Sequence, residues 1–192
     1  MACLYLRSTQ PGAAEGRSSN DFFAHNARFA PKAQVIQPKE ALVMLRKMPG
    51  VQAMYEESRN WLARDNLIRM VVVFLRGGFF CANNCWLRRK LPGSRRAGAS
   101  GSLHLFSNGN AIDNSLFGCG RPGHPALWDA IMEACRRIYQ IIYTGAQRLN
   151  DEQAAWATGG PALESANSPI RPWNRVVVHR ASGTYDLGPV DD

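Results

Sequence analysis

The sequence predicts a mainly α-helical fold built on two long amphipathic helices, at about residues 51–76 and 125–149. In both segments apolar residues recur at the i, i+3, i+4 spacing of one buried helix face. The chain has 192 residues, 45% of them hydrophobic and 20% charged, which is typical of a globular protein with one sizeable core. We therefore expect the two helices to pack together with shorter helices, between extended N- and C-terminal arms.

The first long helix is expected to run from Val51 to the glycine pair at Gly77. Its last part, residues 70–75, is apolar and β-branched, and a short run of this kind also fits a strand. The alternative is therefore an α+β fold with short strands near residues 70–75, 101–106 and 175–180. The expected buried face comprises Val51, Met54, Tyr55, Ser58, Trp61, Leu62, Ile68, Val71, Val72 and Leu75.

The second long helix is expected to begin at Pro125, because proline is favoured in the first turn of a helix. Shorter helices are expected at residues 38–48, ended by a Pro-Gly pair, and at residues 151–157. The expected buried face of the second long helix comprises Trp128, Ile131, Met132, Cys135, Ile138, Tyr139, Ile142 and Ala146.

These elements divide the chain into three parts. Residues 1–37 form an N-terminal arm, residues 38–157 a helical core with a basic loop at 88–102, and residues 158–192 an extended C-terminal arm. Prolines and glycines without sustained periodicity mark both arms. Extended arms around a compact core are typical of subunits of large assemblies.

A basic, acid-free stretch occupies the centre of the chain. The formal net charge is +8, and no acidic residue occurs between Asp65 and Asp113. Guanidinium groups neutralise phosphates, and neighbouring aromatic rings stack on unpaired bases. The predicted nucleic-acid-binding residues are Arg88, Arg89, Lys90, Arg95, Arg96 and Trp86.

The sequence thus favours a non-catalytic, basic assembly subunit that contacts nucleic acid, RNA in particular, of ribosome-associated or coat-nucleoprotein type. No complete catalytic motif is present, so an enzyme is the less favoured class. The alternative is an accessory structural subunit of an organellar or membrane-bound complex, whose basic loop meets an acidic protein surface or anionic lipid head groups.

The five cysteines indicate an intracellular protein, cytoplasmic or organellar. Their odd number and irregular spacing argue against a secreted disulfide framework. The first residues lack the apolar core of a signal peptide, although an organellar transit peptide stays open. The longest apolar run, Met70 to Leu75, is too short for a transmembrane segment.

The cysteines also allow one metal site, the only cofactor site that the sequence suggests. Cys81 and Cys85 would share a face if they lie on a helix, and Cys119 and His124 would complete a tetrahedral zinc site. The alternative is that the thiols are buried as small apolar groups.

The stretch from Cys119 to His124 resembles the middle of a retroviral-type zinc knuckle, Cys-x2-Cys-x4-His-x4-Cys. Leu116 and Asp129 stand where that motif has its first and last cysteines, so two of its four ligands are absent. A second alternative function is a thiol- or zinc-dependent hydrolase. There Cys119 would be the nucleophile, His104 or His179 the base, and Asp113 the orienting group.

Overall fold

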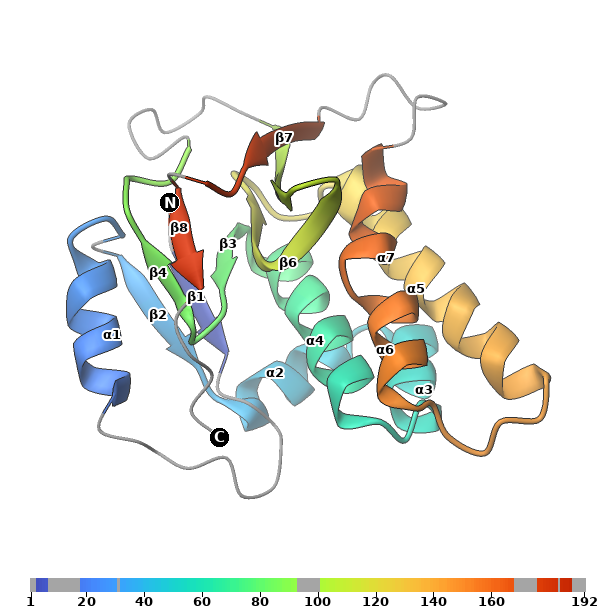
Figure 1. Cartoon of the computed structure of the whole chain (residues 1–192). Helices are drawn as coiled ribbons and strands as arrows, with labels where there is room; N and C mark the ends of the chain where they lie inside the picture. The colour runs from blue at the N-terminus through green and yellow to red at the C-terminus, as the bar shows by residue number, and fades with distance from the viewer. Residues whose placement is uncertain are drawn as a thin grey trace.

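The structure is a computed structural model, and it describes residues 3–6, 18–30, 32–92, 101–167, 176–182 and 184–187. Within these residues the fold is α+β, with a six-stranded mixed sheet and a separate two-stranded pair (Figure 1). The strands are β1 (Cys3–Leu6), β2 (Ala33–Ile36), β3 (Gly78–Cys81), β4 (Cys85–Leu87), β5 (Leu103–Asn108), β6 (Ala111–Cys119), β7 (Val176–Arg180) and β8 (Tyr185–Leu187). The helices are α1 (Ser18–Ala27), α2 (Pro38–Leu45), α3 (Pro49–Glu57), α4 (Trp61–Arg76), α5 (Pro125–Tyr143), α6 (Asp151–Thr158) and α7 (Gly160–Glu164), with a 3-10 turn at Ser165–Asn167.

The large sheet has the strand order β2-β1-β3-β6-β5-β7. β1 is parallel to both of its neighbours, β2 and β3, and β7 is parallel to β5, whereas β6 is antiparallel to β3 and β5. From β1 the chain passes to β2 on one side, and from β2 it passes through three helices to β3 on the other side. The strand order therefore reverses at β1.

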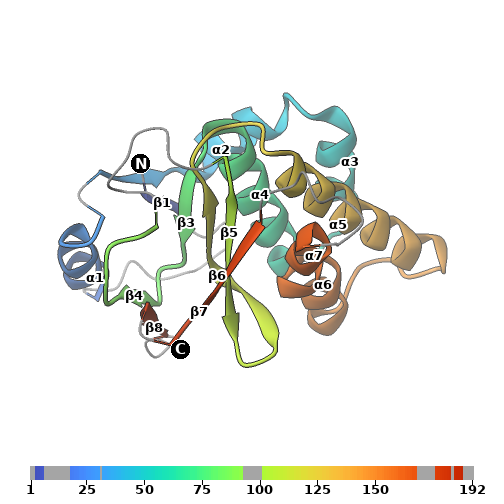
Figure 2. The ribbon, with the colours of Figure 1, turned by 90° about the horizontal axis from the view of Figure 1, so that it is seen from above.

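The elements are arranged in layers about the large sheet (Figure 2). Helices α2 to α7 lie on one side of it, and α1 lies on the other side with the β4–β8 pair. Aromatic rings pack on the sheet, where Phe80 contacts Phe117 at 5.6 Å between ring centres and Phe79 contacts Phe106 at 6.5 Å. These four rings are buried at the centre of the core.

The mainly helical prediction is wrong, and the α+β alternative is the closer one. Two of its predicted strands, near 101–106 and 175–180, correspond to β5 and β7. The third does not exist, because residues 70–75 lie inside α4, where tertiary packing overrides the strand preference of the valines.

The first predicted long helix is two helices, α3 and α4. The chain breaks between them at Arg59, whose φ is +49°. The side chain of Asn60 then caps α4 by accepting a hydrogen bond of 3.0 Å from the backbone N–H of Ala63. The second predicted helix is also shorter than expected, because α5 ends at Tyr143 and a new helix, α6, begins at Asp151.

The two predicted arms contribute to the sheet. β1 and β2 come from the predicted N-terminal arm, and β7 comes from the predicted C-terminal arm. Each is only four or five residues long and pairs in parallel with a strand distant in sequence. Such short strands carry too little periodicity to stand out in the sequence.

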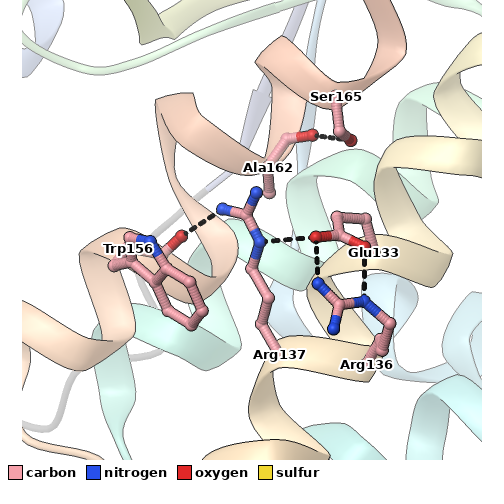
Figure 3. A network of polar contacts seen from close by, with 6 residues as sticks. All are labelled: Glu133, Arg136, Arg137, Trp156, Ala162 and Ser165. Carbon is pink, nitrogen blue, oxygen red and sulfur yellow. Dashed lines mark hydrogen bonds and ion pairs between the residues drawn. The ribbon is translucent and has the colours of Figure 1, made fainter. Parts of the chain in front are cut away.

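A charged cluster joins α5 to α6 (Figure 3). Glu133 accepts hydrogen bonds from Arg136 at 2.6 Å and from Arg137 at 2.8 Å. Arg137 also donates to the backbone carbonyl of Trp156 at 2.8 Å, and its guanidinium lies 4.7 Å from the centre of that indole ring. Through Arg137 these contacts hold α6 against α5.

Candidate functional site

The carboxyl ends of β1, β2 and β3 lie at one edge of the large sheet, because the three strands are parallel. We call this the β3 edge. β6 runs antiparallel to β3, and its last pair there is Leu116 with Cys81, so residues 111–115 extend past the end of β3. In open α/β sheets ligands bind beyond the carboxyl ends of the strands, at the point where the strand order reverses. The β3 edge meets both conditions.

A network of polar side chains lies at this edge, between α4, α6 and β6. Asn66 of α4 is at its centre and is 3% exposed. Its Oδ1 accepts hydrogen bonds from Asn114 at 2.9 Å and from Arg69 at 3.2 Å, and its Nδ2 donates to Thr158 at 3.3 Å. We call Asp65, Asn66, Arg69, Asn114 and Thr158 the amide network.

Arg69 carries the positive charge of this network. Its guanidinium lies 4.9 Å from the centre of the Phe80 ring, and its Nη2 lies 3.6 Å from the carboxylate of Asp65, which is 1% exposed. Burial lowers the pKa of Arg69, and the charge of Asp65 opposes that shift. The Nε–H of Arg69 is a buried donor for which the described part of the chain provides no acceptor. A buried donor of this kind is suited to a ligand oxygen.

Asp113 joins β6 to the β4–β8 pair at the same edge. One of its carboxylate oxygens accepts a hydrogen bond of 2.7 Å from the hydroxyl of Tyr185, and the other accepts from the backbone N–H of Ser115 at 2.8 Å. Burial raises the pKa of Tyr185, and Asp113 raises it further, so this hydroxyl stays a donor across the physiological range.

Two arginines extend the polar surface along β4 and β8. Arg89 donates from Nε and Nη2 to the hydroxyl of Thr184, at 3.1 Å and 2.6 Å. Arg88 pairs with Asp186, and its backbone N–H donates to the carbonyl of Thr184 at 2.8 Å. Because Thr184 precedes Tyr185, this surface continues through Tyr185 and Asp113 to the amide network.

Two histidines meet on the face of the sheet near Arg89. Nδ1 of His104 and Nε2 of His179 are 2.9 Å apart, and the two rings stack. Burial lowers the pKa of His104 to about 4, with further lowering by His179 and His124. Burial and the charge of Arg89 lower the pKa of His179. Both rings are therefore neutral at neutral pH.

The predicted nucleic-acid-binding residues are only partly brought together. Arg88, Arg89 and Lys90 directly follow β4 and are exposed. Trp86 packs edge-on against Phe22 and His25, so its ring is engaged with α1. Two further predicted residues, Arg95 and Arg96, lie outside the described residues.

The four predicted zinc ligands do not form a metal-binding group. Cys81 is in β3 and Cys85 in β4, not on one helix face. The thiol of Cys119 donates to the carbonyl of Arg121 at 3.1 Å, and His124 hydrogen-bonds the carbonyl of Gly101 and caps α5. Within the described ranges no three His, Cys, Asp or Glu side chains are placed to hold a metal ion. Burial raises the pKa of Cys119 to about 11, so the predicted nucleophile is a thiol at neutral pH.

An apolar groove of about 590 Å³ lies away from this edge, between α3 and α5. Its lining includes Met48, Met54, Trp128, Met132 and Tyr139. It contains none of the residues of the amide network and does not contribute to the candidate site.

Sequence reasoning missed the amide network, because its members come from α4, α6 and β6. One signal was present: Asp65, Asn66 and Arg69 interrupt the apolar sequence of α4, and the first two are buried. Buried polar groups on an otherwise apolar helix are expected to serve a network or a ligand.

None of the described helices has the length and apolar character needed to cross a bilayer.

Comparison with known proteins gives a likeness in fold. No family model and no curated protein matches the sequence. A solved structure of the PaToxG glycosyltransferase superposes with a TM-score of 0.60 at 11% sequence identity, over 86% of this chain and 66% of that one, slightly less than two thirds of its length. A transferase mutant superposes with a TM-score of only 0.39 at 9% identity, over 82% of this chain and 88% of that one. The chain therefore shares the fold of PaToxG.

This likeness corrects the expected function. The sequence predicted a non-catalytic, nucleic-acid-binding assembly subunit with a helical core and extended arms. That prediction is wrong: the chain has an α+β fold like that of a glycosyltransferase, and strands from both predicted arms belong to its large sheet.

Proposed function

We propose that this chain is a glycosyltransferase-type protein that binds a nucleotide sugar at the β3 edge. The observation that carries the proposal is the buried guanidinium of Arg69 beside the side-chain amides of Asn66 and Asn114, because its Nε donor has no acceptor among the described residues. The position of this network where the strand order reverses supports it, as does the fold shared with PaToxG.

The residue types at the edge suit a sugar. Each sugar hydroxyl is both a donor and an acceptor, and carboxamide and carboxylate groups recognise that pattern. The hydrogen bond from Asn114 to Asn66 fixes the orientation of the Asn114 amide. Asp113, Asn114 and Ser115 are each half-buried, so they remain accessible from the edge.

In the proposed reaction the bond from the anomeric carbon to the diphosphate breaks, and the nucleoside diphosphate leaves with the electron pair. A bond forms between the anomeric carbon and an oxygen of the acceptor, whose proton passes to solvent. The residues of the amide network orient the sugar for this step and exclude water from one side of it. An intracellular location belongs to the same proposal, and the free thiols of Cys81, Cys85, Cys119 and Cys135 support it.

The test is isothermal titration calorimetry with UDP-glucose, UDP-N-acetylglucosamine and GDP-mannose. We expect one of these nucleotide sugars to bind. Asn114→Ala should weaken its affinity by about tenfold, because one amide of the network is lost. Arg69→Met should weaken binding further. Arg76→Met is the matched control, since Arg76 lies at the other end of α4 and pairs with Glu40 at 3.1 Å.

Transfer is then followed as release of nucleoside diphosphate from the sugar that binds. Equal affinity in the wild type and in Asn114→Ala would contradict the placement of the ligand. Absence of binding to every nucleotide sugar would overturn the proposed function.

A further inference from the structure

We infer that the β3 edge holds the diphosphate of its ligand with the guanidinium groups of Arg88 and Arg89, without a carboxylate-bound divalent cation. The inference rests on the proposed function, because it concerns how the same site neutralises the charge of a nucleotide sugar.

A diphosphate in a protein site needs positive charge close to its oxygens. One solution is a magnesium or manganese ion, held by one or two carboxylates together with the phosphates. The other solution is a set of guanidinium groups, which bind phosphate oxygens with two parallel N–H donors. The numbers and partners of the carboxylate and guanidinium side chains at the edge decide between these two solutions.

Among the described residues, carboxylates are scarce at this edge. β3 is followed by Ala82, Asn83 and Asn84, and the sequence has no acid between Asp65 and Asp113. Asparagine can supply a carbonyl oxygen to a cation, but it brings no negative charge to balance one.

The carboxylates that the described residues place along the edge already have partners in the protein. Asp65 pairs with Arg69, and Asp186 pairs with Arg88. Asp113 accepts from the Tyr185 hydroxyl and from a backbone N–H. The donor set of the described residues therefore does not fit a divalent cation, and no metal-binding group occurs among those residues.

Guanidinium groups, by contrast, lie both in the amide network, where Arg69 is, and beside β4 and β8, where Arg88 and Arg89 are. Arg89 is exposed and is held by two hydrogen bonds to Thr184, which occupy two of its five N–H donors. These bonds fix the position of an exposed side chain. Its charge already acts on its surroundings, since it contributes to lowering the pKa of His179.

A short series of hydrogen bonds and sequence neighbours connects Arg89 to the amide network, which includes Arg69. Thr184 holds Arg89, the next residue Tyr185 donates to Asp113, and Asn114 follows Asp113 and donates into the amide network. A ligand along this path would place its sugar at the amide network and its diphosphate against Arg89 and Arg88. The basic residues of the centre of the chain would thus bind phosphate in a nucleotide sugar, not in a nucleic acid.

The experiment is calorimetric titration of the full chain with UDP and with inorganic pyrophosphate, each in excess EDTA and in excess magnesium or manganese. Pyrophosphate isolates the diphosphate contacts from those of base and sugar. We expect both probes to bind with EDTA present, with dissociation constants that change less than about twofold when metal is added. Arg89→Gln should weaken pyrophosphate binding by about tenfold, and Arg88→Gln by less, because Arg88 is shared with Asp186.

Arg46→Gln is the matched control, because it removes one positive charge from an exposed position at the end of α2. It should leave both dissociation constants unchanged. Binding that requires the metal would overturn this inference and leave the proposed function standing. Metal-free binding that both the Arg88 and Arg89 variants retain would overturn the assignment of the cations. Failure of UDP and of every nucleotide sugar to bind in any buffer would overturn both.

Discussion

The guanidinium of Arg69 lies 4.9 Å from the centre of the Phe80 ring and also meets the buried carboxylate of Asp65. The side chain of Arg69 therefore stacks on Phe80 of β3 and pairs with the carboxylate of Asp65 in α4. The buried pair is costly to break, because removing either partner takes away the opposite charge beside the other.

We expect Arg69→Met to lower the free energy of unfolding by about 2–4 kcal/mol, because the buried carboxylate of Asp65 then loses the guanidinium with which it pairs. The double variant Asp65→Leu/Arg69→Met should recover part of that loss. Urea unfolding of the wild type, both single variants and the double variant measures the coupling. Arg76→Met should cost less than about 1 kcal/mol, since its pair with Glu40 is exposed. A loss of similar size in Arg69→Met and Arg76→Met would contradict the buried pair.

Gly160 allows α7 to approach β6 closely beside the candidate site. A Cβ added there would lie 1.8 Å from the backbone carbonyl oxygen of Ile112. We expect Gly160→Ala to cost at least about 2 kcal/mol, because backbone must shift to relieve the overlap. Gly50→Ala is the control, since an added Cβ there meets nothing within 4 Å. Thermal unfolding of the two variants would show the difference, and equal melting temperatures would rule out the close approach.

Glu133 should stabilise the α5–α6 contact in a pH-dependent manner. The hydrogen bonds from Arg136 and then Arg137 hold the pKa of Glu133 at about 2, below the ordinary value of 4.5. Its contribution is therefore fully present above about pH 4.5 and is lost as the pH falls through about 2. We expect Glu133→Gln to cost about 1 kcal/mol at neutral pH and almost nothing near pH 2. Urea unfolding at the two pH values tests this, with the exposed Glu164→Gln as control.

His104 should make the protein sensitive to mild acid. Burial, His179 and His124 depress the pKa of His104 to about 4, against 6.5 for an ordinary histidine. The neutral ring therefore contributes stability above about pH 6.5, and that contribution is lost as the pH falls through about 4. We expect a loss on the order of 2 kcal/mol across this range. His104→Gln should have a flatter profile in chemical unfolding, and a profile as steep as that of the wild type would point to other groups.

The sequence was informative where periodicity is strong and local. Pro125 correctly begins α5, and the predicted short helices at 38–48 and 151–157 correspond to α2 and α6. The buried strands were not identified as the main architecture, because residues such as Gly78 to Cys81 are buried on both faces and lack alternation.

The candidate site was predictable only in fragments. Arg88 and Arg89 were identified from the basic stretch, but their neighbours were not. Thr184 lies about a hundred residues further along the chain, and Asn114 meets Asn66 only because β6 lies against α4. No local pattern encodes such pairings, since they depend on the strand order of the sheet.

The strand order also constrains how the protein can be made. β7 lies beside β5 and comes from residues 176–180, whereas β1, in the interior of the same sheet, comes from residues 3–6. The sheet therefore cannot be completed during synthesis until residues 176–180 have left the ribosome. Until β7 emerges, the apolar strands β3 and β5 of the nascent chain are exposed to incorrect pairing. Co-translational folding should thus show a late, abrupt gain of protease resistance, and not a gradual one.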